Sequence, residues 1–149
     1  MYGTVKLGND STSRARILRE CRDWLKAFLT VNHTRLVVFE APMTPDQLHG
    51  HTNINSIRQQ IGLSETVDEL LFDKFDVREA KVTDVRRFFL GTTRMKREDA
   101  KARTTYQCRR LGWKPCDDNA ADALALWSYQ CAIMSPERSV KLLPLWGEK

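Results

Sequence analysis

The sequence predicts an α/β fold, and three observations lead to this prediction. Residues 12–31 and 53–72 each carry apolar residues at the three- and four-residue spacing of an amphipathic helix. Between them stands the continuous apolar run "LVVF" at residues 36–39, which is typical of a strand buried on both faces of a parallel sheet. Helix and strand patterns keep alternating after this run, as in α/β domains. The chain of 149 residues has the length of one domain with one core.

The first thirty residues are expected to form a strand and a helix. Residues 2–7 alternate weakly and contain β-forming side chains, so they predict a strand that ends at a turn over residues 8–10. The helix over residues 12–31 follows. Ser11 or Ser13 can begin it, because a serine oxygen accepts a free backbone N–H of the first turn.

The apolar run at residues 36–39 ends in Glu40. Pro42 cannot continue a central strand, so the strand stops there. Glu40 is therefore expected at the C-terminal end of a buried parallel strand, which is where open α/β sheets place their binding sites. The next helix covers residues 53–72, and Gly62 allows a kink within it.

The second half of the chain is predicted to be mainly helical. Glycines at 91 and 112 follow two of the helical patterns and are expected to end them. The predicted elements are a strand over 75–82, a helix over 83–90, a basic loop over 92–97, and helices over 98–111 and 117–134. We expect residues 1–135 to form the domain and residues 136–149 a C-terminal tail.

The net charge is +5, and the positive charge is clustered. Residues 78–114 contain twelve lysines and arginines against four acids. A second basic set lies within the first predicted helix: Arg14, Arg16, Arg19, Arg22 and Lys26. Such clusters fit the phosphates of a nucleic acid, because binding releases condensed counterions. A solvated helix face explains them equally well at this point.

Other sequence features point to a cytoplasmic protein without a membrane span. No run approaches the roughly 18 apolar residues that a membrane helix needs. The N-terminal residues lack the apolar core of a signal peptide. The four cysteines show no CxxC spacing and are expected to be reduced thiols. His49 and His51 flank a glycine in a loop and are expected to face solvent rather than a metal.

The stretch "DDNAADALALW" at residues 117–127 carries the chemistry that the sequence suggests. Acids and asparagine at its start suit a helix N-terminus. Asp118 and Asp122 are four residues apart, and Asn119 and Asp122 three apart, so each pair shares a helix face. If this helix packs beside Glu40, several oxygen atoms converge, and such ligands suit Mg²⁺ or Mn²⁺. Alternatively, Asp122 is simply solvated.

Several segments together resemble RuvC-type Holliday junction resolvases, especially the phage and prophage branch. The matching segments, in order, are "LVVFEAP", "NINSIRQQIGL", "VTDVRRFFLG", "EDAK" and "LGWKPCDDNAADALALW". The resemblance as a whole runs from about residue 2 to residue 133, and the strand-end "FE" and the final "DNAADALAL" are its most specific parts. The resemblance implies an RNase H-like fold, with a mixed sheet flanked by helices. It also implies a dimer that cuts four-way DNA junctions with divalent metal, in a bacterial or phage-infected cell.

The resemblance also implies roles for particular residues. Glu40 matches the family's acid at the end of the fourth strand, and Asp122 matches the last acid, on the C-terminal helix. Asn119 stands where the family has an aspartate or histidine ligand, and Asp118 can serve instead. Lys101, in "EDAK", matches a lysine that the family places near the junction DNA.

The sequence departs from the family at its start. The family's first metal-binding acid stands on a first strand, in a segment like "ALDLGTKTGWA". This chain begins at what corresponds to the third strand, so we expect the first two strands and that acid to be missing. A late-called gene start, an inactive remnant and a partner subunit that fills the gap all explain this.

The leading hypothesis is a metal-dependent endonuclease for branched DNA. Glu40, Asp118, Asn119 and Asp122 would hold the metal, and Lys101 would assist at the DNA. The other residues expected to hold phosphates are Arg86, Arg87, Arg94, Lys96 and Arg97. The alternatives are a non-catalytic protein of the same fold that binds branched DNA, and a basic α/β domain that binds a protein.

Overall fold

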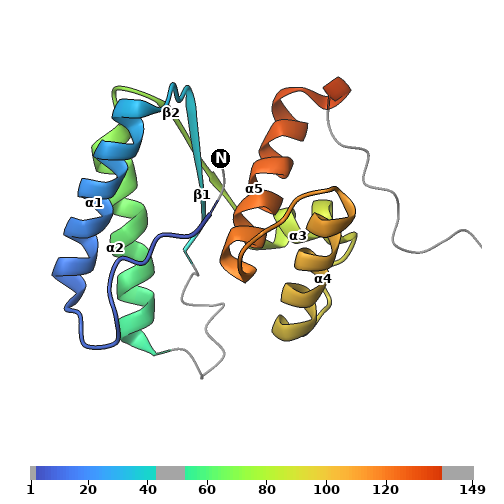
Figure 1. The fold of residues 1–149 in the computed structure, drawn as a ribbon, viewed down its shortest axis with the longest axis horizontal. Helices are drawn as coiled ribbons and strands as arrows, with labels where there is room; N and C mark the ends of the chain where they lie inside the picture. The colour runs from blue at the N-terminus through green and yellow to red at the C-terminus, as the bar shows by residue number, and fades with distance from the viewer. Residues whose placement is uncertain (1–2, 43–52, 139–149) are drawn as a thin grey trace, which may run out of the picture. The chain divides into compact units, whose positions relative to one another are not determined.

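The computed structural model describes residues 3–42 and 53–138 and shows a mixed α/β protein. It contains five α-helices and a small parallel sheet of two strands (Figure 1). The chain divides into two compact units. Residues 6–79 form the N-terminal unit, and residues 80–138 together with residues 3–5 form the C-terminal unit.

The N-terminal unit alternates helix and strand. Helix α1 (Arg14–Val31) begins after Ser13, whose side chain accepts a hydrogen bond from the Arg16 N–H. Strand β1 (Leu36–Glu40) pairs with strand β2 (Asp76–Ala80), the last residue of which belongs to the C-terminal unit. Helix α2 (Ile54–Leu71), capped by Asn53, connects the two strands. Parallel strands need such a crossover, because a short turn cannot return the chain to the same end of the sheet.

Helices α1 and α2 lie side by side and bury their apolar stripes (Figure 1). The buried residues are Ile17, Cys21 and Leu25 on α1 and Ile57, Thr66 and Leu71 on α2. Gly62 allows close contact, because a Cβ atom added there would stand 3.1 Å from Cδ1 of Leu18. Helix α2 continues without a break through this glycine, so its role is in packing.

The C-terminal unit is a cluster of helices. These are α3 (Val82–Leu90), α4 (Arg97–Arg110), α5 (Asp118–Met134) and the short 3₁₀ helix η2 (Pro136–Arg138). Gly91 and Gly112 follow α3 and α4 with φ of 73° and 81°, a conformation that favours glycine. The predicted helices of this half are confirmed to within about one residue at each end.

The core of the C-terminal unit joins α3, α4 and α5. Its buried members are Phe89, Leu90, Ala100, Cys108, Ala121, Leu124 and Ala125. Small residues on both α4 and α5 let these helices approach closely, and the Cys108 thiol donates to the carbonyl oxygen of Ala121 at 3.7 Å. Trp113 closes one side and stacks on Phe89 with ring centroids 6.3 Å apart.

Two predictions about strands are wrong. Residues 3–7 form no strand, and Tyr2 lies outside the described residues. Val5 is 45 % exposed, so the weak alternation there reflects no buried face. Strand β1 is not buried on both faces: its four apolar residues are half-buried and Glu40 is exposed. A strand in a two-stranded sheet has one free edge, which explains this exposure.

Two predicted segments are not described by the structure. The loop with His49 and His51 and the tail after residue 138 lie outside the described residues. Among the described helices, none combines the length and apolar character that crossing a bilayer requires.

Candidate functional site at the start of helix α5

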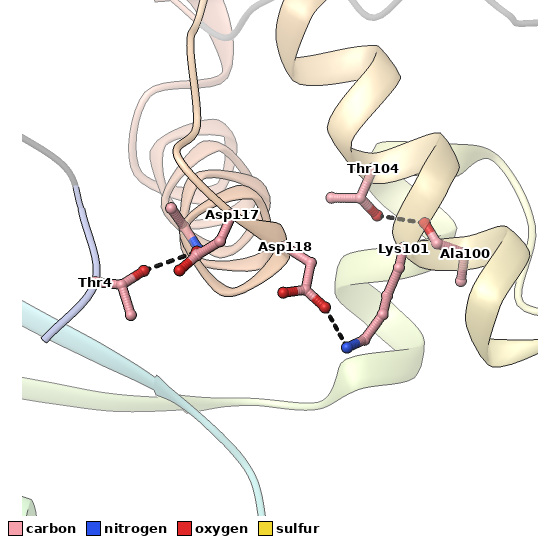
Figure 2. Close-up of polar contacts among 7 residues, drawn as sticks. Thr4, Ala100, Lys101, Thr104, Asp117 and Asp118 are labelled. Carbon is pink, nitrogen blue, oxygen red and sulfur yellow. Dashed lines mark hydrogen bonds and ion pairs between the residues drawn. The ribbon is translucent and has the colours of Figure 1, made fainter. Parts of the chain in front are cut away.

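The start of α5 is held in place by Asp117. One oxygen of its carboxylate, Oδ1, accepts the backbone N–H of Ala120 at 2.8 Å, which caps the helix. The same oxygen accepts the hydroxyl of Thr4 at 2.7 Å (Figure 2). A capped helix has a fixed first turn, so the next residues, Asp118 and Asp122, are presented from a defined backbone.

Asp118 is paired with a lysine. Figure 2 shows the Lys101 ammonium of α4 and the Asp118 carboxylate of α5 pointing toward each other, and they form a charged hydrogen bond. This hydrogen bond is the main reason that the pKa of Asp118 lies below its usual value. The two side chains retain 34 % and 38 % of their exposure, so water and ligands can reach the pair.

Asp122 lies one turn further along α5, where both an acid and several cations affect its pKa. Its pKa is raised, chiefly because surrounding protein displaces water from the carboxylate, and the negative charge of Asp118 adds to the rise. Three cations act in the opposite direction: Arg86, Lys101 and Arg97. The residue remains exposed overall, so its carboxylate can still take up a proton or a cation. The structure thus brings five of the predicted site residues into one charged cluster at the start of α5.

The remaining predicted cations, Arg87, Arg94 and Lys96, are not among those whose charges act on Asp122. Arg87 donates to the Asp84 carboxylate of its own helix at 3.3 Å. Arg94 and Lys96 are exposed residues of the segment between α3 and α4. All three belong to the C-terminal unit, as the cluster does.

Glu40 and Asn119 complete the predicted site residues. Asn119 is exposed on the first turn of α5, next to Asp118. Glu40 ends β1, as predicted, but it belongs to the N-terminal unit. The described geometry therefore joins Asp118, Asp122 and Lys101, while Glu40 is described only within its own unit.

The chemistry of this donor set suits a hard divalent cation. Asp118 and Asp122 offer carboxylate oxygens close enough for their charges to interact, and Asn119 adds an amide oxygen. Lys101 competes for the same oxygens of Asp118. Within residues 3–42 and 53–138, no three histidine, cysteine or acidic side chains are grouped closely enough to hold a metal ion.

On the outer face of α4 the sequence prediction named Lys101 and missed the other residues. Lys101, Ala102, Thr105, Tyr106 and Arg109 line an open groove of about 410 Å³, together with Asp118. Tyr106 is 58 % exposed. The sequence carries only a partial signal: Tyr106 is the single aromatic residue of α4, but its exposure is not visible in the sequence.

No protein-family model matches the chain, and a search of curated proteins found no match.

Proposed function

We propose that this protein is a metal-dependent endonuclease for branched DNA, related to the RuvC-type resolvases and their RNase H-like fold. In this proposal it hydrolyses phosphodiester bonds at four-way or branched junctions, acts as a homodimer and uses Mg²⁺ or Mn²⁺. The sequence segments that resemble this family support the proposal, as does the charged cluster at the start of α5.

One observation carries most of the weight. Two carboxylates that share a helix face, Asp118 and Asp122, lie among the cations Arg86, Arg97 and Lys101. A carboxylate pair alone would repel a DNA phosphate. Flanking cations offset that repulsion, and a polyanion can then approach a metal-binding carboxylate.

Each group has a distinct part in the proposed reaction. Asp118 and Asp122 would hold the metal, with Asn119 and Glu40 as further oxygen donors. Bound Mg²⁺ or Mn²⁺ would polarise the phosphate and lower the pKa of a water molecule. Arg86 and Arg97 would hold the phosphates beside the scissile bond. Lys101 would orient Asp118 before metal binds and contact the DNA backbone after that.

The test is cleavage of a labelled four-way junction with Mg²⁺, with Mn²⁺ and with EDTA. The wild-type chain is expected to produce metal-dependent nicks. Asp122→Asn should abolish them while junction binding survives, because the amide keeps the size of the side chain but loses the charge that attracts the metal. Asp73→Asn, at an exposed aspartate of the N-terminal unit, is the matched control and should cleave like the wild type.

Equal loss of binding and cleavage in Asp122→Asn would contradict a catalytic role for this carboxylate. Cleavage that persists in EDTA would contradict the metal dependence.

A second function is favoured by the Lys101–Asp118 pair. A lysine that already neutralises a predicted metal ligand suits a protein that binds branched DNA without cutting it. Such a protein would bind the junction with a steep dependence on salt and would produce no nicks with either metal.

A further inference from the structure

The outer face of α4 carries a continuous stripe of side chains that is separate from the helix core. The helix buries Ala100, Thr104, Gln107 and Cys108. The stripe consists of Lys101, Ala102, Thr105, Tyr106 and Arg109, which recur at steps of one, three or four residues and therefore share one side of the helix. These five residues and Asp118 line the open groove.

Three properties of this groove point to the same kind of ligand. The surface that lines it is mainly apolar. Tyr106 lines the groove and is largely open to solvent. Two cations and one acid border it, so the groove has a net positive charge. A flat apolar group with a phosphate attached matches this combination.

We propose that the groove takes up one unpaired nucleotide of a DNA strand, with its base stacked on Tyr106 and its phosphate held by Arg109 and Lys101. This inference rests on the proposed function, and it specifies which part of the DNA is recognised. Because the bases of an intact duplex are stacked on each other, their faces are closed to a tyrosine on a helix. Where strands branch or end, a base face becomes accessible.

The position of Asp118 affects which of the two cations binds the phosphate more strongly. Its carboxylate holds the Lys101 ammonium at one end of the groove, so the lysine is oriented before a phosphate arrives. The acid also weakens the attraction to any anion at that end, and Arg109 is left as the stronger phosphate contact. The stacking and phosphate contacts can therefore be removed separately, through Tyr106 and Arg109.

The experiment measures binding of a short single-stranded oligonucleotide that contains 2-aminopurine, whose fluorescence is quenched on stacking, in the full chain and without metal. Tyr106→Ala is expected to weaken binding by about 5- to 140-fold and to abolish the change in quenching, since base stacking on an aromatic residue has that range of effects. Tyr106→Phe should bind within about twofold of the wild type, because the ring remains. Phe72→Ala, at a residue of the N-terminal unit that is 72 % exposed, is the matched control for loss of an exposed aromatic ring and should bind like the wild type.

The phosphate contact is tested by the salt dependence of the same binding. Arg109→Ala is expected to reduce the slope of log affinity against log salt by about 0.7, the value for one phosphate contact on a single strand. Arg58→Ala removes the same charge from an exposed position on α2 and should leave the slope unchanged.

Two outcomes would overturn the inference. One is unchanged binding of the single strand by Tyr106→Ala. The other is equal weakening of single-strand and blunt-duplex binding by this variant, which would mean that the ring does not recognise an unpaired base.

The inference and the proposed function can fail separately. A wild-type chain that nicks junctions while Tyr106→Ala binds the oligonucleotide normally keeps the nuclease proposal and refutes the nucleotide site. A chain that loses oligonucleotide binding in Tyr106→Ala but never nicks a junction keeps the site and refutes the nuclease.

Discussion

The cap of α5 offers a quantitative test of how the charged cluster is positioned. Asp117→Ala removes the acceptor of the Ala120 N–H and the partner of the Thr4 hydroxyl at the same time. Loss of an N-cap acceptor costs about 1 kcal/mol, within a range of about 0.5–2. The Thr4 hydrogen bond adds about 0.5–1 kcal/mol, toward the low end of the usual range because both groups are exposed. We therefore expect a free energy of unfolding that is lower by about 1.5–2 kcal/mol.

The assay is urea unfolding followed by circular dichroism, with three further variants. Asp117→Asn retains an acceptor oxygen and should cost at most a few tenths of a kcal/mol. Thr4→Val should cost about 0.5–1 kcal/mol in the wild-type chain and almost nothing in Asp117→Ala, because the partner is then already gone. Thermal melting should follow the same order, at about 4–8 °C for each kcal/mol in a unit of this size.

Two results would refute this reasoning. If Asp117→Asn destabilised the protein as much as Asp117→Ala, the oxygen acceptor would not be the source of the effect. If Thr4→Val cost the same in both backgrounds, the contact between residues 4 and 117 would contribute nothing, and the first residues would not be fixed to the start of α5.

Two further predictions concern ionisable groups of the C-terminal unit. The raised pKa of Asp122 means that its charged form is disfavoured in the folded state, so its contribution to stability is greatest below the ordinary value of 3.8 and is lost as pH rises through the folded pKa. Asp122→Asn should therefore gain stability relative to the wild type at neutral pH and lose this gain well below pH 3.8, as measured by urea unfolding at both pH values; a gain that grows in acid would contradict the sign. Burial raises the pKa of the Cys108 thiol to about 11, whereas Cys116 is exposed, so alkylation at neutral pH followed by mass spectrometry should modify Cys116 first and Cys108 only on unfolding. Equal rates in the native protein would contradict the burial of Cys108.

The sequence predicted the helices well, because local signals determine their ends. Ser13, Asn53 and Asp117 are cap residues, and Gly91 and Gly112 supply the backbone conformation that ends a helix. The strands were predicted less well. Whether an extended segment joins a sheet depends on a partner far away in the sequence, and residues 3–7 have none among the described residues.

The charged cluster was predicted in part. The shared helix face of Asp118 and Asp122 follows from their spacing. The hydrogen bond between Lys101 and Asp118 does not, because it joins residues 17 positions apart on two helices and depends on how α4 and α5 pack. Tyr106 was missed because an isolated aromatic residue reads as a core residue until its exposure is known. That Glu40 binds the same metal ion as the acids of α5 remains a prediction.

The buried alanines between α4 and α5 have a consequence for mutational tolerance. Ala121 is fully buried and Ala125 nearly so, and Ala121 lies against Cys108. Such positions have almost no side chain to lose, but any larger side chain forces the helices apart. Substitutions at this interface should therefore be restricted by size, with glycine or serine accepted more readily than valine or leucine. A spacing that tolerates only small residues keeps the lysine of one helix within reach of the acid on the other.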